Sequence, residues 1–210
     1  MRIIKLNEQS RANILADLLK RDPNNYSAYE GTVQEIVDDV RARGDEALFE
    51  YTKKFDGAEL SADNIRVTQA EIQEALSQVD PNLLAVMKKS MKNIREYHEK
   101  QKQYSWFDSK PNGTILGQKV TALSSVGVYV PGGKAAYPSS VLMNIIPAEV
   151  AGVEKIVMVT PPGKDGRVNP VTLIAAHLAG ATEVYKVGGA QAIAALAFGT
   201  KSIPRVNKIV

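Results

Sequence analysis

From residue 113 to the C-terminus, short segments rich in β-branched residues alternate with longer segments of helical pattern. The expected strands are 113–123, 126–130, 154–159, 183–187 and 206–210, and the expected helices are 139–150, 169–178 and 190–198. When a helix connects two strands of one sheet, it carries the chain back so that the second strand runs parallel to the first. The sequence therefore predicts an α/β fold with a parallel sheet covered by helices. Ligands of such sheets bind beyond the carboxyl ends of the strands.

The first hundred residues carry clear start and stop signals for helices. The segments 32–35 and 68–71 both fit a capping box, in which a hydroxyl and a carboxylate bond to free backbone amides at a helix start. Gly44 is typical of a helix end, and the next helix is expected to begin at Asp45 and to run to about residue 55. The pair Asp-Pro at 80–81 predicts the start of a longer helix.

This longer helix combines an apolar face with a basic one. Four apolar residues recur at intervals of three and four, which predicts one buried face: Leu84, Met87, Met91 and Ile94. The other positions are rich in Lys and Arg between 88 and 102, with Glu96 and Glu99 among them. A solvated helix face explains this pattern better than nucleic-acid binding, because no recognition motif accompanies it. The aromatic cluster at 104–107 is expected to pack in a core or against another subunit.

Three of the predicted strands end in turns rich in Gly and Pro, at 131–133, 160–163 and 188–191. Together these turns would line one crevice, in which glycines let a ligand approach the backbone and free amides at helix starts favour phosphate oxygens. The alternative is that they are only the tight connections that any fold of this kind needs. Each turn taken alone favours this second interpretation.

Two common phosphate-binding motifs do not fit these turns. A P-loop ending at 133–134 would need glycine at position 128, which is Val128, and Ala135 replaces the hydroxyl residue that holds magnesium. The three-glycine dinucleotide pattern is also absent, because the glycines at 188–189 are followed by Ala-Gln-Ala at 190–192. A nucleotide bound here would need a less usual mode.

The composition excludes several kinds of protein. The chain has no cysteine, which removes disulfides, thiolate zinc sites and thiol nucleophiles. A membrane-spanning helix needs about 20 consecutive apolar residues, and no segment of the chain comes close to this length. No apolar signal-peptide core follows Met1. We therefore expect a cytoplasmic protein without a membrane partner. The net charge of +3 is too small to indicate nucleic acid by itself, so no nucleic-acid partner is expected.

Catalytic and metal-binding residues are harder to find. The chain has two histidines, His98 and His177, and neither stands in a cluster with metal-ligand spacing. We interpret both as structural. No serine lies in a nucleophile-elbow pattern. The sequence thus predicts a binding crevice, with no catalytic residue and no metal ligand assigned within residues 1–210.

Long segments of the chain resemble the histidinol dehydrogenase family. The most specific are VGVYVPGGKAAYPSSVLMNIIPAEVAGV at 126–153, NPVTLIAAHLAGATEVYKVGGAQAIAALAFGT at 169–200 and the final VNKIV. The resemblance implies an incomplete Rossmann-like parallel sheet with an aldehyde-dehydrogenase-like architecture. It also implies a division into a mainly helical region at 1–112, which is part of a split domain, and an NAD-contacting domain at 113–210.

The resemblance implies a zinc-dependent homodimer that oxidises L-histidinol through the aldehyde to L-histidine with two NAD molecules. Tyr129 and Gln191 match positions that contact NAD in the family, and Pro131, Thr160 and Pro162 are weaker candidates for the same crevice. Read from the residues alone, Tyr129 would be an aromatic core residue and Gln191 a residue that caps its own helix.

The same resemblance places other functional residues beyond residue 210. These are the third NAD contact, the glutamate and histidine of the acid–base pair, and the ligands of zinc and substrate. We therefore expect a truncated chain that does not oxidise histidinol on its own. The alternative function is a non-catalytic module that binds a nucleotide or a partner chain.

Overall fold

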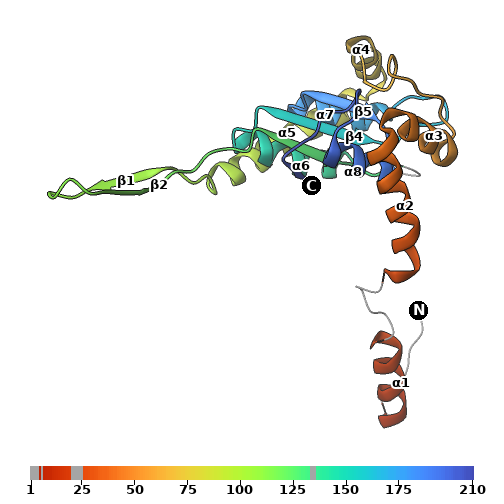
Figure 1. Ribbon diagram of the computed structural model, residues 1–210, viewed down its shortest axis with the longest axis horizontal. Coiled ribbons are helices and arrows are strands. Elements are labelled where there is room, and N and C mark those ends of the chain that lie inside the picture. The colour runs from red at the N-terminus through yellow and green to blue at the C-terminus, as the bar shows by residue number, and fades with distance from the viewer. Residues whose placement is uncertain (1–4, 6, 20–25, 133–135) are drawn as a thin grey trace.

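The computed structural model describes residues 5, 7–19, 26–132 and 136–210. Its helices are α1 (Glu8–Leu19), α2 (Ser27–Arg43), α3 (Asp45–Asp56), α4 (Gln69–Gln78), α5 (Pro81–Glu99), α6 (Pro138–Val150), α7 (Pro170–Ala179) and α8 (Gly189–Phe198). Its strands are β1 (Trp106–Ser109), β2 (Ile115–Gln118), β3 (Ser125–Tyr129), β4 (Lys155–Thr160), β5 (Glu183–Lys186) and β6 (Lys208–Ile209). Helix α1 stands apart from the rest of the fold (Figure 1).

The predicted parallel sheet is confirmed. Its four strands lie in the order β5-β4-β3-β6, and all neighbouring pairs are parallel. Strand β3 pairs with β4 from Ser125 opposite Lys155 to Tyr129 opposite Val159. The connecting helices α6, α7 and α8 lie close to their predicted ranges. The carboxyl ends of β3, β4 and β5 therefore meet at one edge of the sheet.

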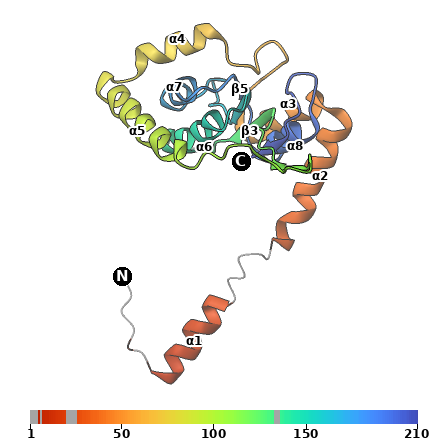
Figure 2. The ribbon, with the colours of Figure 1, turned by 90° about the vertical axis from the view of Figure 1, so that its left-hand side faces the viewer.

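Helices cover both faces of this sheet (Figure 2). Val126, Val128 and Met158 face a core that they share with α5, α6 and α7, and all three are buried. Val157 and Val159 point to the opposite face and pack with α2, α3 and α8. Because successive strand residues point to opposite faces, a continuous apolar strand such as β4 needs helices on both sides.

Only one of the two predicted capping boxes exists. Thr68 and Glu71 form it at the start of α4, where each side chain accepts a hydrogen bond from the other's backbone amide. The box at 32–35 was wrong, because α2 already begins at Ser27 and these residues lie within it. Inside a helix the amides bond to carbonyls four residues earlier, so position 32 has no free amides to cap.

The other helix signals are confirmed. Gly44, at φ 63°, separates α2 from α3. The Asp80 carboxylate accepts a hydrogen bond from the amide of Asn82, 2.8 Å away, at the start of α5. On α5, Met87 is buried, whereas Leu84, Met91 and Ile94 are half-buried against the same core.

Two residues of the basic face of α5 pair with acidic neighbours. Lys92 pairs with Glu96 along the helix, and Arg95 binds Glu149 of α6. These pairs agree with a solvated helix face that is tied to the next helix.

Residues 104–123 form a separate arm between α5 and β3. In it, β1 and β2 pair antiparallel, from Trp106 opposite Gln118 to Ser109 opposite Ile115. Every residue of the arm is exposed, and the arm projects away from the sheet (Figure 1). A strand over all of 113–123 was therefore wrong, because only Ile115–Gln118 of this segment forms a strand. The antiparallel pairing limits β2 to four residues because β1 is equally short.

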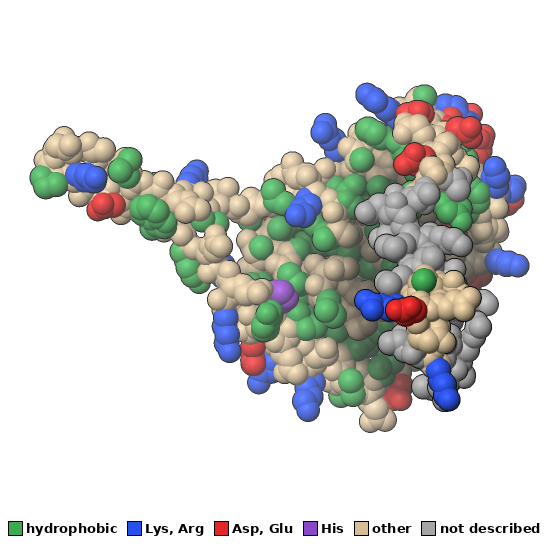
Figure 3. Space-filling model, turned by 90° about the horizontal axis from the view of Figure 1, so that it is seen from below, with side chains coloured by type: hydrophobic (Ala, Val, Ile, Leu, Met, Phe, Trp, Pro, Cys, Tyr) green, Lys and Arg blue, Asp and Glu red, His purple; other side chains and the backbone are tan. Residues whose placement is uncertain are grey.

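Core packing of the aromatic cluster at 104–107 was also wrong. The exposed fractions of Tyr104, Trp106 and Phe107 are 72%, 56% and 65%. Hydrophobic side chains are visible along the projecting arm in the space-filling view (Figure 3). Contact with another subunit stays a prediction.

The division at residues 112 and 113 falls in the turn between β1 and β2, where the amide of Gly113 donates to the carbonyl of Lys110. The two-domain division stays a prediction. None of the helices in the described ranges has the length and apolar character needed to cross a membrane.

Candidate functional site

Three strand-end turns meet at one proline. A Cβ atom on Gly132, after β3, would lie 2.5 Å from Cγ of Pro161, which follows β4. A Cβ atom on Gly188, after β5, would lie 2.6 Å from Cβ of the same proline. Both positions therefore exclude any larger residue, and the turns pack closely because they lack side chains. Of the first turn, Gly133 lies outside the described residues.

Tyr129 and Gln191 both lie next to Gly189 at the start of α8. The amide of Gly189 donates a hydrogen bond to the Tyr129 hydroxyl over 3.4 Å, and the Tyr129 ring packs against the core on the α8 face. Gly189 has φ 66°, and a Cβ atom there would lie 2.5 Å from Oε1 of Gln191. The turn thus holds the Gln191 side chain against its own helix start.

The Gln191 side chain is an unusual polar group. It is 1% exposed, and neither Oε1 nor Nε2 has a hydrogen-bond partner. It does not cap its own helix, which has no side-chain cap. A buried amide without hydrogen-bond partners lowers the free energy of unfolding by roughly 1–3 kcal/mol, so Gln191 makes the fold less stable. A ligand that reached this helix start would offer the missing partners.

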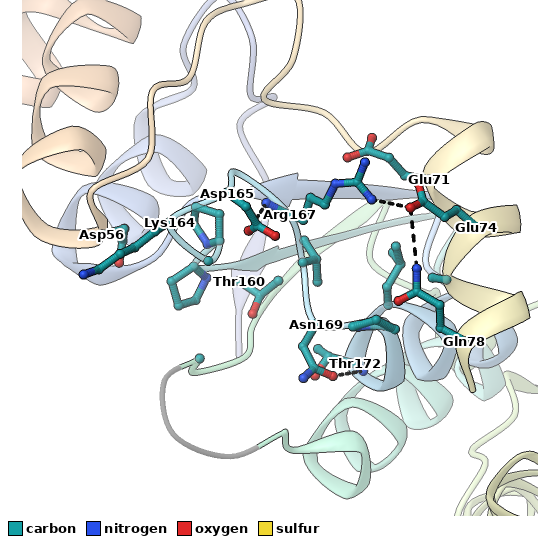
Figure 4. Close-up of a pocket in the computed structure, with 18 of the residues that line it drawn as sticks. Asp56, Glu71, Glu74, Gln78, Thr160, Lys164, Asp165, Arg167, Asn169 and Thr172 are labelled. Carbon is teal, nitrogen blue, oxygen red and sulfur yellow. Dashed lines mark hydrogen bonds and ion pairs between the residues drawn. The ribbon is translucent and has the colours of Figure 1, made fainter. Parts of the chain in front are cut away.

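A cavity of about 820 Å³ lies beside these turns, beyond the carboxyl end of β4 (Figure 4). Thr160 and Pro162 are buried residues of its wall, and Gly132 also lines it. The end of α3 and helix α4, which belong to the helical region, line its two ends. The cavity therefore lies between segments that are far apart in the sequence.

Ion pairs hold α4 over this cavity. Arg167, in the loop after β4, binds Glu74 of α4. Lys186, at the end of β5, is 5% exposed, and its Nζ lies 2.7 Å from Oε1 of Glu71. Burial alone would raise the pKa of Glu71, but hydrogen bonds from Lys186 and Thr68 outweigh it and hold that pKa below its usual value.

Asp56 lines the other end of the cavity, where it is the last residue of α3. Its Oδ2 atom is buried and has no hydrogen-bond partner. Burial raises the pKa of this carboxyl group above its usual value. Asp56 is thus a second polar group that the fold leaves unsatisfied beside the strand ends.

The predicted site residues fall into two groups. Tyr129 and Gln191 lie together at the start of α8, whereas Thr160 and Pro162 line the cavity. Pro131 is exposed on the turn that leads from Tyr129 to Gly132. The Pro161 contacts join the two groups.

Several charged residues line the cavity that the sequence did not predict there, among them Asp56, Glu71, Glu74 and Arg167. Glu71 was assigned only to a capping box, although its second oxygen binds Lys186. The sequence does carry one signal at Asp56. An acidic residue at the end of a helix opposes the helix dipole, so its presence there calls for a reason.

Within the described ranges, no group of three or more His, Cys, Asp or Glu side chains could hold a metal ion. His98 bonds to Gln101 over 2.8 Å on α5, and His177 is exposed at the end of α7. The described residues therefore offer polar binding groups, and we assign none of them as an acid–base catalyst or metal ligand.

Comparisons with known proteins point to one family. A family model for histidinol dehydrogenase matches residues 19–210. The histidinol dehydrogenase of Bacillus subtilis is 60% identical over 178 residues, which are 85% of this chain and 41% of that protein. The histidinol dehydrogenase of Heliobacterium mobile is 55% identical over 177 residues, or 84% of this chain and 41% of that protein.

A solved structure agrees with the sequence relatives. The crystal structure of histidinol dehydrogenase from Elizabethkingia anophelis matches with a TM-score of 0.81 and 37% identity. The match covers 86% of this chain and 41% of that one. The chain thus spans less than half the length of the relatives that it matches.

Proposed function

The chain belongs to the histidinol dehydrogenase family, and from this premise we propose that it is the NAD-contacting part of a histidinol dehydrogenase. The complete enzyme would oxidise L-histidinol through the aldehyde to L-histidine with two NAD molecules. The observation that carries the proposal is the meeting of three strand ends at Pro161, with the unpartnered amide of Gln191 beside them.

The described residues fit NAD on chemical grounds. The unpartnered Gln191 amide can both donate and accept hydrogen bonds. The Tyr129 hydroxyl orients the first turn of α8, whose free amides favour a phosphate group. Pro131, Thr160 and Pro162 would supply walls to the same crevice. When bound, NAD supplies the hydride acceptor.

The described residues do not fit zinc, because they contain no cluster of three or more ligand side chains. We therefore derive no step through zinc from this chain. The family resemblance places the zinc ligands and the acid–base pair in sequence that follows residue 210. We propose that the complete enzyme is a zinc-dependent homodimer and that most of its histidinol site lies in that following sequence.

A joined protein tests this proposal. Residues 1–210 are fused to the part of the Bacillus subtilis relative that follows its matched region, and NADH formation from L-histidinol is measured with zinc present. We expect the fusion to form NADH and the 210-residue chain to form none. If a folded fusion binds NAD without oxidising histidinol, the non-catalytic binding module becomes the better reading. NADH formation by the chain alone would contradict the assignment of the missing residues.

Gln191→Met gives a sharper test of the crevice. Methionine has a similar volume but no amide, so we expect it to weaken NAD binding by about tenfold or more. The same change removes two unpartnered polar atoms, so the free energy of unfolding should stay the same or rise. Gln118→Met, on the exposed arm, is the matched control and should change neither quantity. Unchanged NAD affinity in a folded Gln191→Met variant would remove Gln191 from the site.

A further inference from the structure

The tip of the arm carries a reactive dipeptide. Asn112 is the only asparagine of the chain that is followed by glycine, and both residues are exposed. A Cβ atom on Gly113 would meet no heavy atom of the described residues within 4 Å, apart from its chain neighbours. A backbone amide can attack the side chain of the preceding asparagine, and glycine favours this attack because it has no Cβ atom in the way. The reaction releases ammonia and is called deamidation.

The loop at 110–114 directs the asparagine side chain along the backbone. The amide of Gly113 donates to the carbonyl of Lys110 over 3.0 Å, and the amide of Lys110 donates to the carbonyl of Thr114 over 2.8 Å. Gly113 has φ 84°, as is typical of the glycine in a three-residue hairpin loop. The Asn112 Oδ1 atom accepts a hydrogen bond from the amide of Thr114 over 3.1 Å. This bond stabilises the charge that develops on Oδ1 when a nucleophile attacks the neighbouring carbon.

The loop at 163–167, after β4, repeats this arrangement with an aspartate. The amide of Gly166 donates to the carbonyl of Gly163 over 2.9 Å, and the amide of Gly163 donates to the carbonyl of Arg167 over 2.8 Å. Oδ1 of Asp165 accepts a hydrogen bond from the amide of Arg167 over 3.1 Å, and Gly166 has φ 73°. A carboxylate resists attack by a nucleophile, whereas a neutral amide does not. The molecule therefore contains the same loop twice, once with an amide and once with a carboxylate.

The two loops differ in how firmly the fold holds them. In the loop after β4, a Cβ atom on Gly166 would lie 3.7 Å from Cδ2 of Leu60, and Arg167 binds Glu74. In the part of the chain that the structure describes, β1 and β2 pair only with each other, over four exposed residues each. A two-stranded hairpin without further packing is marginally stable in water, so the arm should open often. Opening frees the Gly113 amide for reaction.

We propose that Asn112 deamidates spontaneously, at a rate that the opening of the arm makes high. The backbone nitrogen of Gly113 loses its proton to solvent base and attacks Cγ of Asn112. A bond between this nitrogen and Cγ forms, the bond from Cγ to Nδ2 breaks, and Nδ2 takes up a proton and leaves as ammonia. Water then opens the resulting succinimide ring. Addition of water at Cγ gives aspartate, and addition at the backbone carbonyl carbon gives isoaspartate.

Both products change the surface of the arm. Among residues 104–123, Lys110 and Lys119 stand against Asp108, and the new carboxylate would cancel the remaining positive charge. Isoaspartate also places one more carbon atom in the backbone, so the loop at 110–114 can no longer close with the same hydrogen bonds. The pairing of β1 with β2 next to the loop should weaken as a result.

Mass spectrometry of the 210-residue chain during storage in mildly alkaline buffer tests the proposal. We expect the peptide that contains Asn112 to exchange NH₂ for OH before any other asparagine peptide, and isoaspartyl methyltransferase to label it. The rate should rise with pH, because the attacking nitrogen must lose its proton. It should lie within about tenfold of the rate in the urea-unfolded chain, because the arm opens often. An Asn112 that reacts in urea but stays unmodified in the folded chain would overturn the proposal.

Asp165→Asn is the matched variant, because it places the same dipeptide in the same loop within the body of the fold. In urea, positions 112 and 165 should react at rates within about twofold of each other, since the fold no longer distinguishes them. In the folded variant, position 165 should react at least about tenfold more slowly than position 112. Circular dichroism establishes that the variant is folded. Equal rates in the folded variant would overturn the role of the open arm.

Asn112→Gln is the second control. Glutamine keeps the amide and the exposure but must close a larger ring, so methyltransferase labelling should fall at least about tenfold. Labelling that persisted in Asn112→Gln would mean that isoaspartate forms elsewhere in the chain, and the assignment to Asn112 would be wrong.

Discussion

The sheet and the arm both contain strands with large apolar residues, but in opposite surroundings. Strand β4 reads Lys-Ile-Val-Met-Val-Thr, and its last five residues are buried between two layers of helices. Strands β1 and β2 carry Trp106, Phe107, Ile115 and Leu116, and all four are more than half exposed. Apolar residues in a strand therefore do not predict what covers that strand. The cover depends on residues elsewhere in the chain or in another chain.

The largest expected effect comes from making the same substitution in both regions. Ile156→Ala in β4, at 1% exposure, should lower the free energy of unfolding by about 2–5 kcal/mol, because it leaves a cavity in a packed core. Ile115→Ala in β2, at 66% exposure, should change it by no more than about 0.5 kcal/mol. Urea unfolding followed by circular dichroism measures both.

A comparable loss in the two variants would contradict this contrast. It would mean that the arm is covered in solution, for example by a second copy of the chain. Repeating the measurement at several protein concentrations distinguishes the two cases, because only an intermolecular cover depends on concentration.

Two ion pairs on α4 extend the comparison from apolar to charged groups. Glu71→Gln leaves the buried Lys186 without a charged partner and should cost about 1.5–3 kcal/mol at neutral pH. Glu74→Gln breaks the exposed pair with Arg167 and should cost less than about 1 kcal/mol. Urea unfolding measures both variants. Equal losses would show that burial does not set the strength of these pairs.

The Glu71 pair also has a defined pH dependence. The folded-state pKa of Glu71 lies below its usual value of 4.5, so the folded state gains stability from this group above that pH. The gain is lost as the pH falls through the folded-state pKa. The native chain should therefore exceed Glu71→Gln most in free energy of unfolding at neutral pH, and this difference should shrink in acid. A difference that stayed constant down to strongly acidic pH would rule out this linkage.

Two strand glycines provide a smaller contrast. A Cβ atom on Gly127 of β3 would lie 2.9 Å from Leu196 and 3.0 Å from Val206. Gly127→Ala should therefore cost about 1–3 kcal/mol through overpacking. A Cβ atom on Gly117 of β2 would lie 2.4 Å from the carbonyl of Trp106. Gly117→Ala should open the arm, seen as faster amide exchange in β1 and β2, with little change in global unfolding.

The smallest expected effect has the opposite sign. Asp56→Asn should raise the free energy of unfolding at neutral pH by up to about 1 kcal/mol, because it removes a charge that burial and the helix dipole disfavour. The folded-state pKa of Asp56 is raised, so the cost of its charge grows as the pH rises above the usual value of 3.8 and is complete above the raised pKa. In strong acid the variant and the native chain should have equal stability. A loss of stability at neutral pH would contradict this account.

The sequence predicted the local parts of the fold well. Thr68 to Glu71, Gly44 and the Asp-Pro pair at 80–81 each fix a helix boundary through bonds within a few residues. The capping box at 32–35 failed for an equally local reason, because the helix had already begun at Ser27. The parallel sheet followed from the order of its strands.

The cavity wall was beyond sequence reasoning for a physical reason. Asp56 and Glu74 reach the end of β4, more than eighty residues away in the chain, only because α3 packs on α8 and α4 on α7. The carboxylate of Glu71 pairs with the buried ammonium group of Lys186. Nothing near Lys186 in the sequence indicates this partner. Gln191 was identified by family resemblance, whereas the absence of any hydrogen-bond partner is visible only in the structure.

The arm also carries the only tryptophan of the chain, Trp106, at 56% exposure. Its intrinsic fluorescence therefore reports on a segment that does not share the core. Emission should be that of a solvated indole, readily quenched, and nearly unchanged while the sheet unfolds. Any molecule that covers the arm should shift the emission to shorter wavelength. The protein thus contains its own optical probe for whatever surface the arm meets.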